Sequence, residues 1–499
     1  MPLDTRCHVA TPLSTKGVHA MAMPQQGMST DEVFARLDEY RQDDLPVKGG
    51  RAWGFVYDAG PEVDAVKQRA VVTYLGKNGL DPTVFPSLER LENDILAIAR
   101  DHLNGGEEVV GTFTSGGTES CMLAVKAARE RGRAKGIEEP ELLLPVTAHA
   151  AFHKGARYFG VKVVPVAVDP ESFMVDLADL EAKLGPSTVL MVGSAAGYAH
   201  GVIDPIEAMG KLAKERDVLL HVDGCIGAWL LPFLAELGED IPPFDFRVPG
   251  VTSISMDLHK YAYAPKGSSV LLFRDAELRR HSYFACAGWT GYSVVNTTMQ
   301  STKSAAPLAG AWAVLHYLGH EGYRKLAASI RDATRALLEG IEAQEDLRIL
   351  GAPKMGLIAI ASDTVEVFQL CDALAARGWY VQPQLAYGGS PKNVHLMVEP
   401  ANARMAEPFL ADLAECVREV KASPAEGPNE MLVQAAKMLT PEMVEQRFDE
   451  LIAMVGGGGG EEGGMLPKER AGLNAVIDML STETKEALLK EFMSKLYRA

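Results

Sequence analysis

A lysine at the end of an apolar run is the first residue in this sequence whose type and place could do chemistry. Residues 253–256 lead through Asp257, Leu258 and His259 to Lys260. Burial at a strand end disfavours the charged form of an amine, so we expect a lowered pKa for Lys260. A neutral amine is the nucleophile that Schiff-base chemistry needs. The alternative is a strand-end lysine whose ammonium group reaches solvent.

Two further polar residues follow other hydrophobic runs. Asp223 ends the run 219–222, where a buried carboxylate needs a cationic partner such as a protonated ring nitrogen, or simply caps a turn. His149 follows the run 142–146, where its imidazole could stack on a planar cofactor or only form hydrogen bonds. Open α/β sheets bind ligands at the carboxyl edge of their strands, so both residues could face the same ligand as Lys260.

A glycine turn offers a place for a phosphate group. Residues 115–120 read Ser-Gly-Gly-Thr-Glu-Ser between a strand and a helix, with Gly117 and Thr118 at the helix start. Small residues let backbone amides approach a phosphate, and the helix N-terminus adds its positive dipole end. The turn lacks the Gly-Lys-Ser/Thr of a P-loop and the GxGxxG dinucleotide fingerprint, which sets aside NAD and flavin chemistry.

The elements that must position these residues form a repeating pattern between residues 109 and 275. Short apolar runs, most of them followed by helical stretches, span residues 109–113, 142–146, 161–168, 189–192 and 218–222. This pattern predicts a mostly parallel sheet with helices on both faces.

Smaller units are predicted around this large domain, which we place at residues 106–345. Residues 1–27 are expected to be a flexible leader, and residues 28–105 an N-terminal segment whose first helix is capped by Ser29 or Thr30. Helices are expected at 304–319 and 322–344. After them we expect a small α+β domain (346–455) that reads strand, helix, strand, strand, then a glycine-rich linker (456–464) and a helical tail (465–499). Ser481 would cap the tail helix, whose apolar stripe comprises Leu488, Leu489, Phe492 and Leu496.

Composition excludes several classes of function. The 499 residues include 66 acidic and 49 basic side chains, and the formal charge of −17 repels phosphate backbones and anionic lipid, so no nucleic-acid partner is expected. Six cysteines without a CxxC pair argue against a disulfide framework and a thiolate zinc site, and we expect no metal. No apolar run reaches the roughly 18 residues that span a bilayer, and no signal peptide is recognised. We therefore expect a cytoplasmic protein.

Taken together, these stretches resemble the group II pyridoxal-phosphate decarboxylases of the aspartate-aminotransferase fold (fold type I), and among them the sphingosine-1-phosphate lyases. The resemblance covers about residues 50–400, and its most specific stretches are 115–120, 148–152, 200–205, 221–223, 259–261 and 264–269. It implies an α/β protein with a large, mostly parallel seven-stranded sheet domain and a small C-terminal α+β domain. It also implies pyridoxal 5'-phosphate as the cofactor.

The resemblance assigns a role to each matching position. Lys260 would hold the cofactor covalently, Asp223 would pair with its ring nitrogen, and His149 would stack on its ring. The cofactor phosphate would be contacted by Gly117, Thr118 and His259. The functional unit would be a homodimer with shared active sites, in which residues 288–292 of one subunit reach the site of the other.

Four residues would meet the substrate: Tyr57, Asn78, Asp81 and Lys266. Asp81 stands where these lyases carry histidine, and a carboxylate repels a phosphate dianion. Asp81 could instead meet a cationic or hydroxylated substrate, or belong to a surface turn.

We expect a carbon–carbon lyase for retro-aldol cleavage of a sphingosine-1-phosphate-like phosphorylated amino alcohol to a fatty aldehyde and phosphoethanolamine. The first alternative is an L-amino acid decarboxylase of the same fold. A protein that binds the cofactor without catalysis, or serves as a scaffold, is the second.

Overall fold

A seven-stranded sheet forms the centre of the molecule. The computed structural model describes residues 23–45, 48–81, 83–422, 430–454, 467 and 469–497; most of the predicted leader and the predicted glycine-rich linker lie outside the described residues. The strand order is β1-β7-β6-β5-β4-β2-β3, and β7 alone in this sheet runs antiparallel to its neighbours. The strands are β1 (Val110–Thr114), β2 (Glu141–Pro145), β3 (Lys162–Val166), β4 (Thr188–Ser194), β5 (Leu219–Asp223), β6 (Val251–Met256) and β7 (Ser269–Phe273). The predicted mostly parallel seven-stranded sheet is confirmed.

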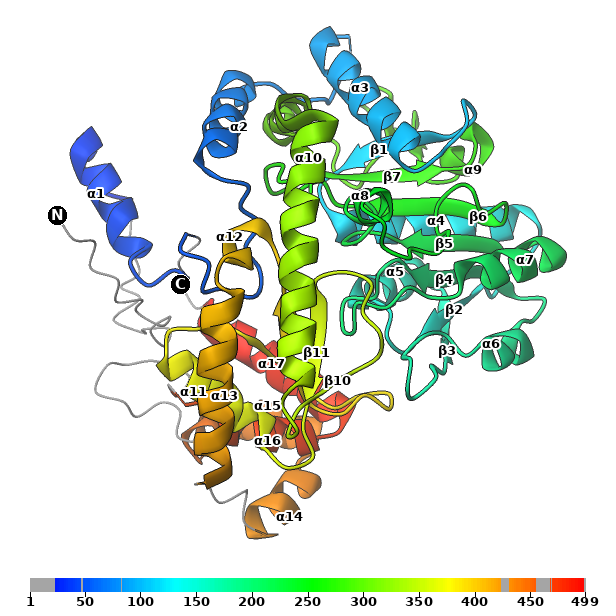
Figure 1. Cartoon of the computed structure of the whole chain (residues 1–499). Helices are drawn as coiled ribbons and strands as arrows, with labels where there is room; N and C mark the ends of the chain where they lie inside the picture. Colours follow the sequence, from blue (N-terminus) through cyan, green and yellow to red (C-terminus); the bar gives the residue numbers. More distant parts are fainter. Residues whose placement is uncertain are drawn as a thin grey trace.

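Helices cover this sheet, as the alternating pattern predicts (Figure 1). Every residue of β4, β5 and β7 is buried, which explains why these strands read as continuous apolar runs. The helices are α2 (Pro61–Tyr74), α3 (Pro86–His102), α4 (Gly117–Ala134), α5 (Ala150–Phe159), α6 (Leu177–Lys183), α7 (Ile206–Arg216), α8 (Leu231–Glu236) and α9 (Ala276–Arg280). Before them, α1 (Thr30–Tyr40) begins at the predicted cap Ser29, which forms a capping box with Glu32.

A long helix, α10 (Ala305–Glu342), joins the large domain to the small one (Figure 1). Gly319 interrupts it with a φ of 55°, a backbone conformation that glycine adopts without strain. The two predicted helices, 304–319 and 322–344, are therefore the two halves of one kinked element.

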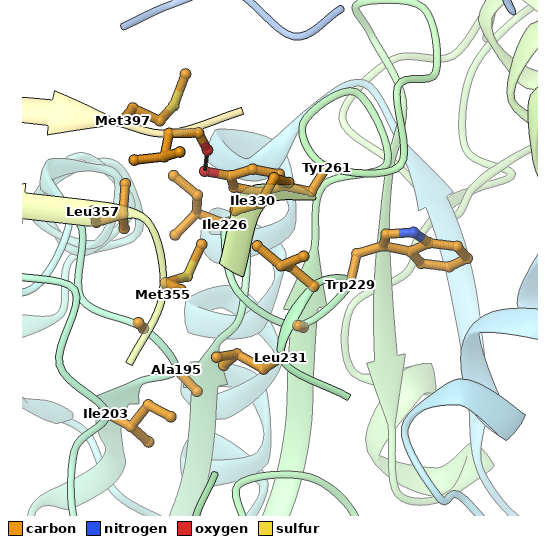
Figure 2. Close-up of a cluster of buried hydrophobic side chains, with 14 of the residues drawn as sticks. Ala195, Ile203, Ile226, Trp229, Leu231, Tyr261, Ile330, Met355, Leu357 and Met397 are labelled. Atoms are coloured by element: carbon orange, nitrogen blue, oxygen red, sulfur yellow. Dashed lines mark hydrogen bonds between the residues drawn. The ribbon is translucent and has the colours of Figure 1, made fainter. Parts of the chain in front are cut away.

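The small domain is a four-stranded antiparallel sheet with the order β10-β11-β13-β12. Its elements are β10 (Arg348–Ile349), β11 (Leu357–Ala361), α11 (Val367–Ala376), β12 (Gln382–Gln384), β13 (Asn393–Met397), α12 (Pro400–Ala403) and α13 (Ala406–Ala422). The two domains share one core: Leu357 and Met397 of the small domain pack with Ile226 and Tyr261 of the large one (Figure 2). The Tyr261 hydroxyl also donates a hydrogen bond to the Val398 carbonyl at 2.9 Å.

In the described part of the chain after α13, four helices follow: α14 (Glu430–Met438), α15 (Pro441–Met454), α16 (Ala471–Met479) and α17 (Thr482–Leu496). Ser481 caps α17 as predicted. Leu488 and Phe492 pack against α15, but Leu489 is 62% exposed, so the predicted stripe is wrong at Leu489. Consecutive residues are about 100° apart around a helix, and Leu489 is turned away from the face that holds Leu488. No helix in the described part of the chain has the length and apolar character needed to cross a bilayer.

Candidate active site

A cavity of about 570 Å³ lies at the carboxyl edge of the seven-stranded sheet. Ser194 and Asp223 end β4 and β5, and His149 and Lys260 follow β2 and β6. The small domain contributes Gln382 and Met397 to the wall of the cavity. All six predicted cofactor residues line it: Gly117, Thr118, His149, Asp223, His259 and Lys260.

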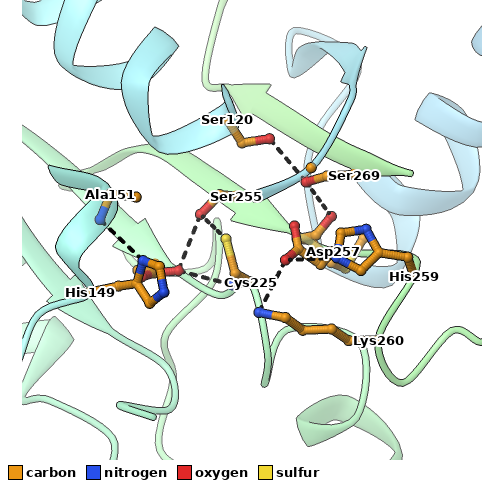
Figure 3. A network of polar contacts seen from close by, with 12 residues as sticks. Ser120, His149, Ala151, Cys225, Ser255, Asp257, His259, Lys260 and Ser269 are labelled. Carbon is orange, nitrogen blue, oxygen red and sulfur yellow. Dashed lines mark hydrogen bonds and ion pairs between the residues drawn. The ribbon is translucent and has the colours of Figure 1, made fainter. Parts of the chain in front are cut away.

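The ammonium group of Lys260 lies 3.0 Å from Oδ2 of Asp257 (Figure 3). Burial by itself would lower the pKa of Lys260, but the negative groups around it, above all Asp257, raise this pKa above its ordinary value. The predicted lowering is therefore wrong. Desolvation alone would lower this pKa, but the turn after β6 brings a carboxylate to the amine.

Asp257 is a functional residue that sequence reasoning missed, although it lies three residues before Lys260. It is 3% exposed, and its Oδ2 also lies 3.6 Å from Nε2 of His259. Asp257 Oδ1 and His259 Nδ1 are both buried and have no hydrogen-bond partner among the described residues. Buried polar atoms without a hydrogen-bond partner indicate a site that binds a polar ligand.

Replacing Asp257 by asparagine should lower the pKa of Lys260, because it removes the nearest negative charge. At neutral pH the apoprotein should then capture pyridoxal phosphate faster, by roughly tenfold for each unit of pKa change. Stopped-flow absorbance over a series of pH values measures the rate of cofactor capture. The pH at which this rate is half-maximal should be lower in Asp257→Asn than in the natural protein. Asp363→Asn, an exposed carboxylate paired with Arg348, is the control. An unchanged pH profile in Asp257→Asn would show that Asp257 does not control the amine.

Asp223 remains an ionised carboxylate although it is only 7% exposed. Burial would raise its pKa, but His149 and Lys260 outweigh that effect and hold the pKa below its ordinary value. Its Oδ1 accepts hydrogen bonds from the Cys225 amide at 3.1 Å and the Ser255 hydroxyl at 3.4 Å. A fixed buried anion of this kind suits a protonated ring nitrogen.

His149, which follows β2, and the glycine turn, which follows β1, line the same cavity. Nδ1 of His149 accepts a hydrogen bond from the Ala151 amide at 3.1 Å, which fixes the exposed ring at the start of α5. In the turn, a Cβ at Gly117 would lie 2.6 Å from Asp257 Oδ2 and 2.8 Å from Cys225 Sγ, so only glycine fits. The close approach of Asp257 and Cys225 to the start of α4 therefore requires a residue without a side chain at position 117.

Glu119 holds this turn in place. One carboxylate oxygen accepts a hydrogen bond from the Ser115 amide and the other from the Met299 amide, both at 2.6 Å. The hydrogen bond between the Met299 amide and Glu119 joins positions 180 residues apart, so no local signal in the sequence pointed to it. The turn, the ionised Asp223, the amine of Lys260 and the ring of His149 together fit pyridoxal phosphate.

The four predicted substrate residues separate into two pairs. Tyr57 and Lys266 line the cavity, and the Lys266 ammonium lies 4.6 Å from the centre of the Tyr57 ring. Asn78 and Asp81 do not line the cavity of the same chain. Asp81 is exposed and accepts hydrogen bonds from the Thr83 amide and hydroxyl at 2.8 and 2.6 Å, which lower its pKa. Within one subunit, Asp81 is therefore a turn residue.

Tyr198 is a second cavity residue that sequence reasoning missed. Its hydroxyl donates a hydrogen bond to the side-chain oxygen of Gln382, which lies 184 residues further along the chain. Burial raises the pKa of Tyr198 to about 12, so the hydroxyl keeps its proton at neutral pH. This hydrogen bond joins the large and the small domain at the wall of the cavity.

Glu399 supports the segment that carries Tyr57. It is 1% exposed, and its Oε2 accepts a hydrogen bond from the Asp58 amide at 2.8 Å. Burial raises the pKa of Glu399 to about 8. Because this folded-state pKa lies above the ordinary value of 4.5, the stability that Glu399 contributes is complete below about pH 4.5 and is lost progressively as the pH rises to about 8.

Glu399→Gln should remove this pH dependence, because glutamine keeps an oxygen for the Asp58 amide and carries no charge. Urea denaturation at about pH 6 and about pH 9 measures the free energy of unfolding. Relative to the variant, the natural protein should lose at least about 1.4 kcal/mol between these two pH values. If the free energies of unfolding of the natural protein and Glu399→Gln differ by the same amount at both pH values, Glu399 does not titrate in this range.

Comparisons with known proteins agree with this geometry. The family model for the conserved domain of pyridoxal-dependent decarboxylases matches residues 56–362, and a helix-turn-helix model for the C-terminal domain of pyridoxal-dependent enzymes matches residues 430–495. The sphingosine-1-phosphate lyase of Oryza sativa is 38% identical over 82% of this chain and 77% of its own. Sphingosine-1-phosphate lyase 1 of Rattus norvegicus is 36% identical over 81% of this chain and 71% of its own.

Solved structures confirm the predicted fold type. The sphingosine-1-phosphate lyase of Burkholderia pseudomallei superimposes with a TM-score of 0.77 and 36% identity, covering 81% of this chain and 94% of that chain. The glutamate decarboxylase of Lactobacillus brevis, with a TM-score of 0.70 and 20% identity over 81% of this chain and 96% of its own, shares the fold. The family match also confirms pyridoxal phosphate as the cofactor.

Proposed function

The chain belongs to the pyridoxal-dependent decarboxylase family, in the group that contains the sphingosine-1-phosphate lyases, and we propose that it cleaves a phosphorylated long-chain amino alcohol to a fatty aldehyde and phosphoethanolamine. The observation that carries this proposal is a second amine in the cavity of Lys260. Lys266 lies over Tyr57 and close enough to Lys260 for the two charges to interact. One amine serves the cofactor, and the other is available to an anionic headgroup.

The chain's own residues would select the bond that breaks. Pyridoxal phosphate, when bound, withdraws electrons from the carbon that carries the substrate amine, and the bond perpendicular to its ring weakens. Asp223 keeps the ring nitrogen protonated, while Lys266 and Tyr57 hold the headgroup and so orient the carbon–carbon bond. The Tyr198 hydroxyl retains its proton and donates a hydrogen bond to the side-chain oxygen of Gln382, so the two residues form one hydrogen-bonded part of the cavity wall.

A product assay tests the proposal. The holoenzyme receives sphinganine-1-phosphate in one series and the common amino acids in another, and aldehyde and carbon dioxide are detected separately. Aldehyde together with phosphoethanolamine supports the lyase. Carbon dioxide without aldehyde would favour the alternative, an L-amino acid decarboxylase. In that enzyme the Lys266 ammonium would bind an acidic group of the amino-acid substrate instead of a phosphate.

A homodimer is the proposed functional unit. The hairpin of β8 (Phe284–Cys286) and β9 (Val294–Asn296) carries a loop with Trp289 and Tyr292, which are 49% and 59% exposed. Two large exposed aromatic side chains on one hairpin are typical of a surface that contacts another protein chain. Light scattering should give twice the mass of the 53.8 kDa chain, and Trp289→Ala should weaken the dimer. A monomeric active enzyme would contradict this part. The cysteine content supports the proposed cytoplasmic location.

A further inference from the structure

The helical unit at the C-terminus, residues 430–454 and 469–497, makes a specific contact with the small domain. The first turn of α16 docks on α11: the carboxylate of Asp372 accepts hydrogen bonds from the amides of Arg470 and Ala471 at 3.1 and 2.8 Å. A carboxylate at a helix start is favoured by the unpaired amides and by the helix dipole. At the other end of α16, the carboxylate of Asp478 accepts a hydrogen bond from the Ala386 amide at 2.7 Å.

Ala386 belongs to a segment, residues 380–390, that we call the wall segment because its other side borders the catalytic cavity. Gln382 lines the cavity and accepts the Tyr198 hydroxyl. Tyr380 packs on Phe55, another lining residue, with ring centres 5.9 Å apart. The wall segment therefore contacts the C-terminal unit at Ala386 and the cavity at Gln382, four residues earlier.

The turn within the wall segment is held by bonds of its own and by contacts with other parts of the chain. Gly388 and Gly389 have positive φ values of 57° and 89°, and glycines lose much conformational freedom when they are fixed. Tyr387 and Ser390 close the turn through two backbone hydrogen bonds, and Ser390 also contacts Nε2 of His200 at 2.9 Å. The bond from Ala386 to Asp478 is charge-assisted and is therefore stronger than a neutral one.

We propose that the C-terminal unit is a brace that fixes the wall segment, and through Gln382 sets how tightly the cavity holds its substrate. The helix-turn-helix match could instead suggest nucleic acid as the partner. Residues 430–495 carry twelve acidic and seven basic side chains, a balance that repels a phosphate backbone. The start of α16 is already occupied by Asp372, so its amides are not available to a phosphate.

Two substitutions at one position test the brace. Asp478→Ala removes the acceptor for the Ala386 amide, whereas Asp478→Asn keeps an oxygen there. Asp449→Ala is the matched control, because its partner Lys495 lies inside the same unit. Hydrogen exchange of the peptide that contains Ala386, in the holoenzyme, should accelerate about tenfold or more in Asp478→Ala. Exchange should remain close to the natural rate in Asp478→Asn and Asp449→Ala.

Kinetics give the second readout, which rests on the proposed lyase function. In Asp478→Ala we expect the KM for sphinganine-1-phosphate to rise several-fold while kcat changes less than about twofold, because the cofactor residues are untouched. If Asp478→Ala has the same hydrogen-exchange rate at the Ala386 peptide and the same KM as the natural enzyme, the proposal that the C-terminal unit is a brace is wrong. If the natural enzyme itself releases no aldehyde, the lyase proposal fails, and hydrogen exchange still decides on the brace. Binding of duplex DNA at physiological salt would also overturn it.

Discussion

Replacement of Lys260 by alanine should lower aldehyde release by roughly 10⁴-fold or more, because the variant lacks the amine that we propose holds the cofactor and passes it to the substrate. Lys260 follows β6 at the carboxyl edge of the sheet and faces Asp223 and Asp257 inside the cavity. Borohydride reduction of the holoenzyme followed by peptide mass spectrometry should place the cofactor on Lys260. The same treatment of Lys260→Ala should leave no lysine labelled.

Lys266→Ala is the matched control, because Lys266 is the second amine in the same cavity. This variant should keep the cofactor on Lys260 and lose affinity for the anionic substrate instead, seen as a raised KM. Full labelling of Lys266 in the Lys260→Ala variant, with activity retained, would show that the two roles are reversed.

Asp223→Asn should cause the second largest loss. Asparagine has nearly the same shape as aspartate but carries no charge, and Asp223, which is 7% exposed, is the anion that we propose for the ring nitrogen of the cofactor. Breaking a buried ion pair costs about 3 to 5 kcal/mol, which corresponds to roughly 10² to 10⁴ in rate if the full cost falls on the transition state.

The measurement for Asp223→Asn combines kcat with the visible spectrum of the bound cofactor. We expect cofactor still attached to Lys260, a shifted absorption band and a large fall in kcat. Asp363→Asn, at an exposed ion pair, should change neither quantity. Natural kcat in Asp223→Asn would show that the carboxylate does not serve the ring nitrogen.

The sequence by itself determined the large sheet and the residues at its strand ends. Continuous apolar runs, typical of strands buried on both faces, end at Asp223 and lead to His149 and Lys260, and parallel strands bring such ends to one edge. Gly117 could be placed as well, because a glycine turn before a helix is a local pattern. All of these residues line one cavity in the structure.

Only the tertiary structure decided the electrostatics and the outer wall of the site. Asp257 raises the pKa of Lys260 because the turn after β6 folds its carboxylate onto the amine, a distance that residue order does not specify. The Tyr198–Gln382 and Glu119–Met299 contacts join positions 184 and 180 residues apart. Local periodicity reports which side of an element is buried, whereas such contacts, like the exposed position of Asp81, depend on how whole elements pack.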